Sequence, residues 1–114
     1  MGICHVMTTE KLYLNPDLKV SDLAKRFNTN STYIHGIIAL SGQKDGTFLS
    51  YVNRYRLNHC LKLMQEYGKA KDVTNYAIAS GFSSRSAFYR TFKKEMNMTP
   101  TQYIKKHSLE GEEE

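Results

Sequence analysis

The chain of 114 residues is 40% hydrophobic, which suits one small soluble domain, and it contains no apolar run near the roughly 18 residues that a membrane span needs. Its N-terminus lacks the features of a secretory signal, and its two cysteines, Cys4 and Cys60, stand too far apart for a disulfide framework, so we expect a cytoplasmic protein. The net charge is +5 although four of the 11 acidic residues lie among the last five positions, so the rest of the chain is basic enough to favour a polyanionic partner or simply to stay soluble.

Apolar residues at helical spacing predict the elements of the first half of the chain. A short helix over residues 20–27 is followed by Asn30, which can cap the next helix, over residues 31–41. A polar loop over residues 42–46 separates this helix from a long one over residues 47–66. No pair of alternating runs predicts a β-hairpin.

The same succession begins again in the second half. A short helix over residues 73–80 ends at Gly81, since glycine readily adopts positive φ. Ser83 or Ser84 can cap a further helix, which continues through Lys94. The pattern therefore predicts a second helix-turn-helix.

Helix-ending and helix-starting residues then predict a last helix. Asn97 tolerates the left-handed conformation that ends a helix. Thr99 is a cap and Pro100 suits the first helical position. Residues 108–114 are acidic, and we expect a disordered tail there.

The two halves form an internal repeat. Ala24 stands six residues before the cap Asn30, and Ala77 stands six residues before Ser83. A Thr-x-x-x-Tyr element follows in both halves at a matching offset. A small residue is needed where two helices cross closely, so the alanines are expected at the helix crossings.

About ten positions of the second half form a pattern of fixed spacing. They are Ala77-x-x-x-Gly81-Phe82-Ser83-x-x-Ser86-x-Phe88-x-Arg90-x-Phe92-Lys93, followed by Thr99-Pro100-x-x-Tyr103. This pattern resembles the signature of the AraC-type (AraC/XylS family) transcription regulators. The first half resembles the same family more weakly, through Leu23-Ala24, Ile34 and Tyr55-Arg56-Leu57. The resemblance covers about residues 18–106.

The resemblance implies an all-α fold of about seven helices, with two homeodomain-like helix-turn-helix subdomains joined by a long linker helix. The DNA-binding domain would cover residues 1–107, ahead of the tail. Within it, the subdomains would be about 8–46 and 70–107, and the linker about 47–66. Two recognition helices would enter successive major grooves, about 34 Å apart, of double-stranded DNA. Such a domain is typically the C-terminal output domain of a larger sensor-regulator, with RNA polymerase as a further partner.

In the second unit, DNA contact is expected along the N-terminal part and the outer face of the recognition helix. The residues are Ser84, Arg85, Ser86, Tyr89, Arg90 and Lys93. Arg85 and Arg90 are candidates for base reading, because a guanidinium can bond guanine O6 and N7 together. Lys94, and Arg54 in the linker, are phosphate candidates. A solvated basic helix face is the alternative interpretation.

In the first unit, the matching positions are Ser31, Thr32, Tyr33, His35 and Gly36. Gly36 stands where the family commonly has a long polar or basic residue, which removes one expected base contact. This unit is therefore expected to read fewer bases, or to rely on His35 and on backbone contacts. Ser31, Thr32 and Tyr33 can bond phosphates, as can the amides at the helix start.

Two further expectations concern the linker helix and other chemistries. Arg56 is expected to form a structural salt bridge with a carboxylate. We expect no metal, no cofactor and no enzyme activity, since the chain has no ligand-spaced Cys or His set and no phosphate-binding or hydrolase motif.

Two other functions stay open at this point. One is a helical protein-interaction module for polymerase or sigma docking, without sequence-specific DNA binding. The other is an RNA-binding helical domain, although the aromatic stacking surfaces of RNA modules are not evident. A salt titration of duplex binding separates these functions from DNA recognition.

Overall fold

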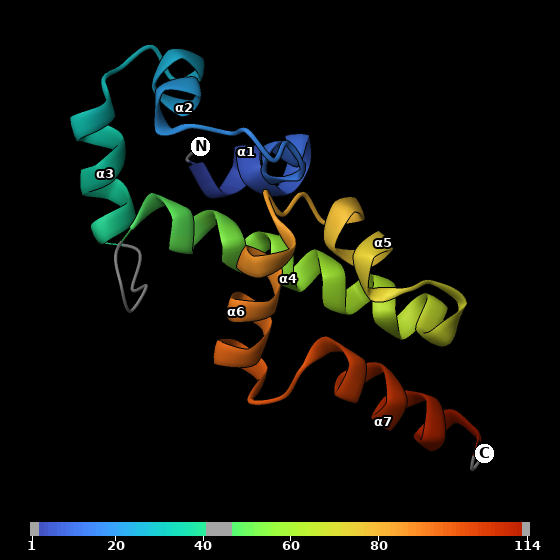
Figure 1. Cartoon of the computed structure of the whole chain (residues 1–114). Helices are drawn as coiled ribbons and strands as arrows, with labels where there is room; N and C mark the ends of the chain where they lie inside the picture. The colour runs from blue at the N-terminus through green and yellow to red at the C-terminus, as the bar shows by residue number, and fades with distance from the viewer. Residues whose placement is uncertain (1–2, 41–46, 113–114) are drawn as a thin grey trace.

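The computed structural model describes residues 3–40 and 47–112, and the regular structure in these two ranges is all helical (Figure 1). Seven α-helices occur there, which confirms the predicted fold class for this part of the chain. In order, the elements are α1 (Ile3–Glu10), η1 (Leu12–Leu14), α2 (Val20–Arg26), α3 (Ser31–Ala39), α4 (Phe48–Tyr67), η2 (Gly68–Ala70), α5 (Val73–Ala79), α6 (Arg85–Met96) and α7 (Pro100–Glu112).

Polar caps set the starts of the later helices. Five cap side chains each accept a hydrogen bond from the amide three residues later, at 2.8–3.2 Å. They are Asn30, Thr47, Asp72, Ser84 and Thr99. Each cap satisfies an amide that has no partner inside its helix, and is worth about 1 kcal/mol.

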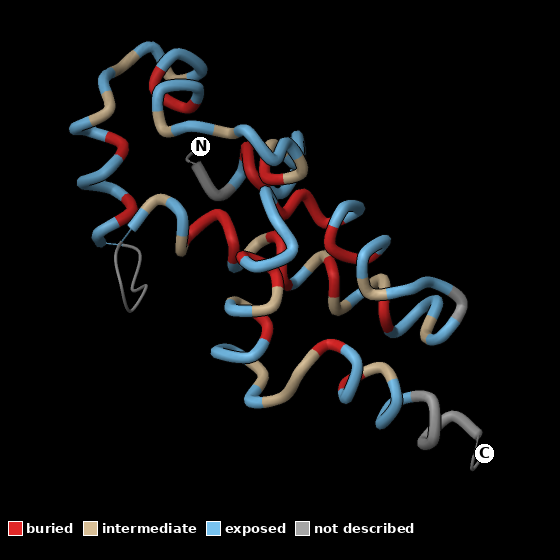
Figure 2. Tube along the Cα trace, viewed as in Figure 1, coloured by how far each residue is buried: buried red, intermediate tan, exposed pale blue. Residues whose placement is uncertain are grey.

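Two apolar clusters form the core, and α4 contributes to both of them. Tyr51 and Val52, near the start of α4, pack in the first cluster with residues of α2 and α3. Leu57, Cys60 and Met64 pack in the second cluster with residues of α5, α6 and α7. Figure 2 shows the buried stretches of α4 between these two groups of helices. The long helix therefore joins two small helical units.

The α2–α3 turn and the α5–α6 turn begin with the same hydrogen bond and the same backbone conformation, but they differ in length. The carbonyl oxygens of Ala24 and Ala77 both accept a hydrogen bond from the amide five residues later, at 2.8 and 3.2 Å. Asn28 and Gly81, each four residues after its alanine, adopt positive φ of 54° and 85°. Of the two predicted cap candidates, Ser83 and Ser84, the structure uses Ser84, so the second turn is one residue longer than the first.

Among the described residues, Arg56 forms no ion pair with a carboxylate, so the predicted salt bridge is not found there. It is buried, with 2% of its surface exposed, and its guanidinium donates to neutral oxygens. Nε donates to the Tyr13 carbonyl at 2.8 Å, Nη2 to the Asn15 carbonyl at 2.9 Å and Nη1 to Asn53 Oδ1 at 3.0 Å. Burial lowers the pKa of the guanidinium. The hydrogen bonds of Arg56 thus connect η1 and the residue after it to the middle of α4.

Gly81 brings the second unit against the same segment. A Cβ added to Gly81 would lie 2.6 Å from Leu14 Cα and 2.8 Å from the Leu14 carbonyl carbon. Real Cβ contacts are never this short, so glycine is required for the α5–α6 turn to reach η1. The contacts of η1 with Arg56 and Gly81, called the η1 junction below, connect the two units.

The N-terminal helix α1 was not predicted from the sequence. Val6 and Met7 are buried on its inner side. Arg26 Nη2 and Glu10 Oε2 form an ion pair at 2.6 Å between α2 and α1. The hydrogen bond from Arg26 lowers the pKa of Glu10. Residues ahead of α2 therefore complete the first unit.

Two predicted boundaries differ from the structure. We expected disorder from residue 108, whereas α7 continues to Glu112, since extension of an existing helix is favourable for residues such as Leu and Glu. The helix predicted over residues 31–41 ends at Ala39. The polar loop predicted over residues 42–46 lies outside the described residues.

Candidate nucleic-acid interface

An aromatic cluster holds the inner face of α6. Phe88 and Phe92 are fully buried, and their rings meet edge to face with centroids 5.8 Å apart. Phe82 makes an edge contact with Phe88 at 5.1 Å, and Tyr103 of α7 makes one with Phe92 at 5.5 Å. Such ring contacts have preferred geometries, so they determine which face of α6 is turned outward.

The outward face of α6 carries the side chains that were predicted to contact DNA. The exposed ones are Ser84, Arg85, Ser86, Arg90, Lys93 and Lys94. Tyr89 is half-buried, and the Arg85 guanidinium carbon lies 5.6 Å from the centroid of its ring. This cation–π contact keeps Arg85 against the helix surface near its N-terminus. The predicted residues of the second unit thus share one polar, cationic surface.

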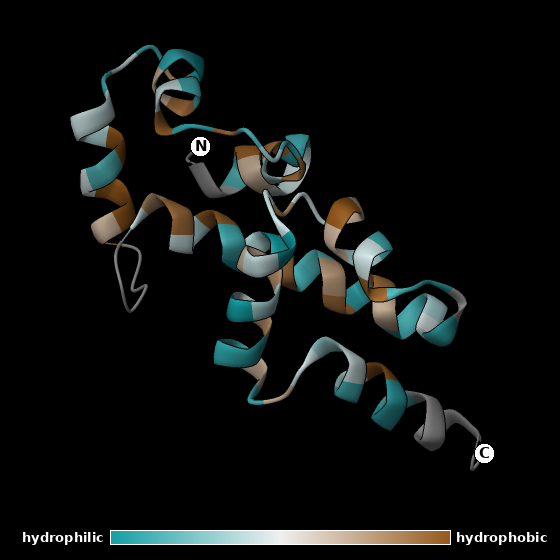
Figure 3. Cartoon of the chain, in the orientation of Figure 1, coloured by the Kyte–Doolittle hydropathy of each residue, from teal (hydrophilic) through white to brown (hydrophobic). Residues whose placement is uncertain are grey.

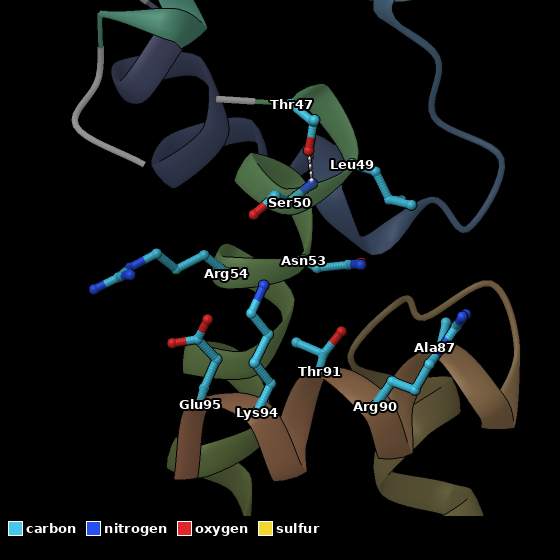
Figure 4. Close-up of a pocket in the computed structure, with 10 residues that line it drawn as sticks. All are labelled: Thr47, Leu49, Ser50, Asn53, Arg54, Ala87, Arg90, Thr91, Lys94 and Glu95. Carbon is cyan, nitrogen blue, oxygen red and sulfur yellow. Dashed lines mark hydrogen bonds between the residues drawn. The ribbon is translucent and has the colours of Figure 1, made fainter. Parts of the chain in front are cut away.

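A groove of about 300 Å³ lies between the first half of α4 and α6 (Figure 4). Its walls bring three predicted contact residues together, Arg54 from α4 with Arg90 and Lys94 from α6. Figure 4 shows Lys94 and Glu95 pointing across the groove toward α4, on the side where Arg54 lies. Although Arg54 is distant from α6 in the sequence, it therefore belongs to the same surface.

The corresponding helix of the first unit, α3, has a different surface. Ile34 and Ile38 form its inner face and are fully buried. Ser31 is half-buried, and the other predicted residues, Thr32, Tyr33, His35 and Gly36, are exposed. A Cβ added to Gly36 would meet nothing within 4 Å, so no contact among the described residues requires glycine there.

The exposed apolar side chains on α3 and at its C-cap, Leu40, were not identified from the sequence. Tyr33, Ile37 and Leu40 are 59%, 37% and 89% exposed. In Figure 3, α3 is largely brown or pale, whereas α6 carries teal on successive turns. Residues three and four positions apart share a helix face, so the spacing of these three residues was the available signal.

The described residues also bear on metal binding, thiol chemistry and membrane insertion. None of the His, Cys, Asp and Glu side chains there form a group of three or more that could hold a metal ion. Burial raises the pKa of the Cys60 thiol to about 12, so the reactive thiolate does not form near neutral pH. Within the same ranges, each helix is either too short or too polar to cross a bilayer.

A family model described as "Helix-turn-helix domain" matches residues 23–106. The chain is 34% identical over 88 residues to the melibiose operon regulatory protein of Escherichia coli K12, covering 77% of this chain and 28% of that protein. It is 30% identical over 93 residues to the probable transcription factor PqrA of Proteus vulgaris, covering 82% and 73%.

Two further comparisons agree with these. The transcriptional regulatory protein HptR of Staphylococcus aureus is 32% identical over 89 residues, which are 75% of this chain and 32% of HptR. Among solved structures, a protein of unknown function from Listeria innocua matches with a TM-score of 0.72 at 25% identity, over 94% of this chain and 99% of that one.

The family match begins within α2 and extends into α7, so it includes α3, α6 and the long helix α4 between the two units. The named relatives are regulators of transcription. The chain therefore belongs to the AraC-type helix-turn-helix family of DNA-binding transcription regulators.

Proposed function

We propose that this chain binds double-stranded DNA sequence-specifically, with α3 and α6 as recognition helices in successive major grooves. The observation that carries the proposal is the outward face of α6. Arg85, Arg90 and Lys93 are exposed there, while buried aromatic rings hold the opposite face. A fixed helix with an arginine-bearing outer surface is suited to reading base edges.

The predicted residues divide into two groups in this proposal. Arg85 and Arg90 read bases, with Ser86 and Tyr89 beside them on α6. Lys93, Lys94 and Arg54 contact phosphates, with the last two facing the α4–α6 groove. In the first unit, the candidates are Ser31, Thr32, Tyr33, His35 and Gly36 on α3.

The dimensions of the molecule support contact with two grooves. Its principal extents are 51 × 24 × 24 Å, and successive major grooves on one face of DNA are about 34 Å apart. Figure 1 shows α3 beside the start of α4 and α6 against its first half. The helix α4 and the η1 junction would hold the two recognition helices at one separation.

The relatives suggest the context of this domain. The chain spans 28% of the length of the melibiose operon regulatory protein and 32% of HptR. We propose that it serves as the C-terminal output domain of a longer, cytoplasmic regulator with a sensor region.

Binding-site selection from random duplex DNA, followed by a salt titration, tests the proposal. We expect two short conserved blocks with centres about 10 base pairs apart. The logarithm of the binding constant should fall by about 0.9 per phosphate contact for each tenfold rise in salt. If the chain does not bind duplex DNA at low salt, the proposal is wrong. The protein-docking module would then be the favoured function.

A further inference from the structure

The caps of α3 and α6 allow the two helices to be compared position by position. Asn30 caps α3 and Ser84 caps α6, and each side chain accepts a hydrogen bond from the amide three residues later. With the caps aligned, the fully buried pairs also coincide, Ile34 and Ile38 of α3 with Phe88 and Phe92 of α6. The two outward faces can therefore be compared directly. The equivalent pairs are Ser31 and Arg85, Thr32 and Ser86, His35 and Tyr89, Gly36 and Arg90, Ala39 and Lys93, and Leu40 and Lys94.

Each cation of the outward face of α6 is replaced by an uncharged residue in α3. Arg85 and Arg90 correspond to Ser31 and Gly36, and the two lysines correspond to Ala39 and Leu40. The sequence of α3 contains no Lys, Arg, Asp or Glu. Packing does not explain the change at Gly36, since a side chain there would enter open space.

The outward surface of α3 combines small polar groups with apolar ones and carries no Lys or Arg. Leu40, at the position equivalent to Lys94, is 89% exposed, and Tyr33, 59% exposed, lies to one side of this face, at the position equivalent to the buried Ala87. The exposed Thr32 adds a methyl group and a hydroxyl. In a major groove, the apolar group that such side chains can contact is the 5-methyl group of thymine.

We propose that α3 recognises thymine methyl groups by van der Waals contact, and that α6 supplies most of the cationic attraction to DNA. This inference rests on the proposed DNA binding of both helices. A protein partner on α3 is the competing occupant. The DNA groove is favoured because α3 occupies the same place in its unit as α6, and because Thr32 and His35 keep polar groups at the edge of the apolar surface.

The test replaces thymine by deoxyuridine, which removes the 5-methyl group and leaves the charge and base pairing of the duplex unchanged. The duplex is the one selected for the proposed function, with its blocks assigned to α3 or α6 by footprinting of the intact chain. Deoxyuridine in the α3 block should weaken binding about fourfold per contacted methyl group, with no change in salt dependence. Deoxyuridine in the α6 block should have a smaller effect.

Variants of exposed residues give a second, independent readout. Leu40→Ala should weaken binding to the thymine duplex and have little effect on binding to the deoxyuridine duplex, because both changes remove the same contact. Ile78→Ala is the matched control, since Ile78 is an aliphatic side chain of α5 that is 70% exposed. Its effect should be the same on both duplexes.

Three results would overturn the inference in distinguishable ways. Full affinity with deoxyuridine in the α3 block would show that α3 does not contact methyl groups. If selection yields only one block and footprinting assigns it to α6, then α3 does not bind DNA and its apolar surface fits a protein partner. The proposed DNA binding would still hold for α6. Absence of duplex binding at low salt would contradict the proposed function itself, and this inference with it.

Discussion

Replacing glycine by alanine is expected to have opposite effects on stability at Gly81 and at Gly36. Gly81 has φ +85° and lies against the backbone of Leu14, so any side chain there is strained and obstructed. Gly36 lies in mid-helix with open space around it. One glycine is required by tertiary contact, and the other lowers helix stability without an internal reason.

Gly81→Ala should lower the free energy of unfolding by about 3 kcal/mol, since backbone strain adds to the clash with η1. Gly36→Ala should raise it by up to about 1 kcal/mol, because alanine favours the helix. Urea unfolding of both variants measures the two values. Changes of the same sign would contradict this account of the η1 junction.

Arg56 and Arg54 are separated by one residue of α4 and differ in burial. Arg56→Lys should lower the free energy of unfolding by about 2 kcal/mol, because an ammonium group cannot reach all three oxygens that the planar guanidinium bonds. Arg54→Lys is the control, and as an exposed change it should stay within about 0.5 kcal/mol. Equal stability of the two variants in urea would argue against the role of Arg56.

At the scale of single helices, the outer surface of α6 should separate base reading from phosphate binding. Arg85→Ala should relax sequence preference in one block more than it weakens binding to random duplexes. Lys93→Ala should weaken binding to all duplexes similarly and reduce the salt slope by about 0.9. Anisotropy titrations on selected and random DNA measure both. Equal losses on both DNAs for Arg85→Ala would count against its base-reading role.

The lack of Lys and Arg on α3 supports a complementary prediction. Gly36→Arg places in α3 the residue that α6 has at the equivalent position, Arg90, so it should raise affinity for random duplex DNA and steepen the salt slope by about 0.9. Ile78→Arg adds the same charge on the exposed side of α5. If the two variants raise affinity equally, the effect is one of net charge, and α3 need not face a groove.

At the scale of the whole molecule, α4 and the η1 junction connect the two units. Leu57, Cys60 and Met64 of α4 belong to one apolar cluster and Tyr51 and Val52 to the other, so the helix cannot turn independently of either unit. The contact of Gly81 with Leu14 adds a second connection. The proposed recognition helices are therefore expected to keep one relative orientation.

A duplex with about 5 base pairs inserted between the two selected blocks should bind at least tenfold more weakly, since the insertion turns one block to the opposite face of the DNA. An insertion of about 10 base pairs restores the face but lengthens the site, and should also bind weakly. Anisotropy with the selected duplex as the reference measures both losses. Unchanged affinity for the half-turn insertion would show that the units move independently or that only one of them binds.

The starts and ends of several helices could be predicted from the sequence, because their signals are local. Thr99 and Pro100 start α7, Asn97 ends α6 with φ 58°, and Asn30 caps α3, because each of these effects involves neighbours within one helical turn. The internal repeat and the cationic residues of α6 were also visible, since they depend only on spacing along one helix. The assignment of these residues to DNA contact stays a prediction.

Contacts between residues distant in the sequence could not be predicted from the sequence and became visible in the folded chain. The partners of Arg56 in the backbone lie 41 and 43 residues earlier, so sequence pattern gave no reason to prefer carbonyl oxygens over a carboxylate. The packing of α1 and the approach of Gly81 to Leu14 also depend on residues that are distant in the sequence. A buried charge is stabilised by the polar groups that the complete fold brings close to it. A local sequence pattern does not specify which distant groups these are, nor where two backbone segments approach each other.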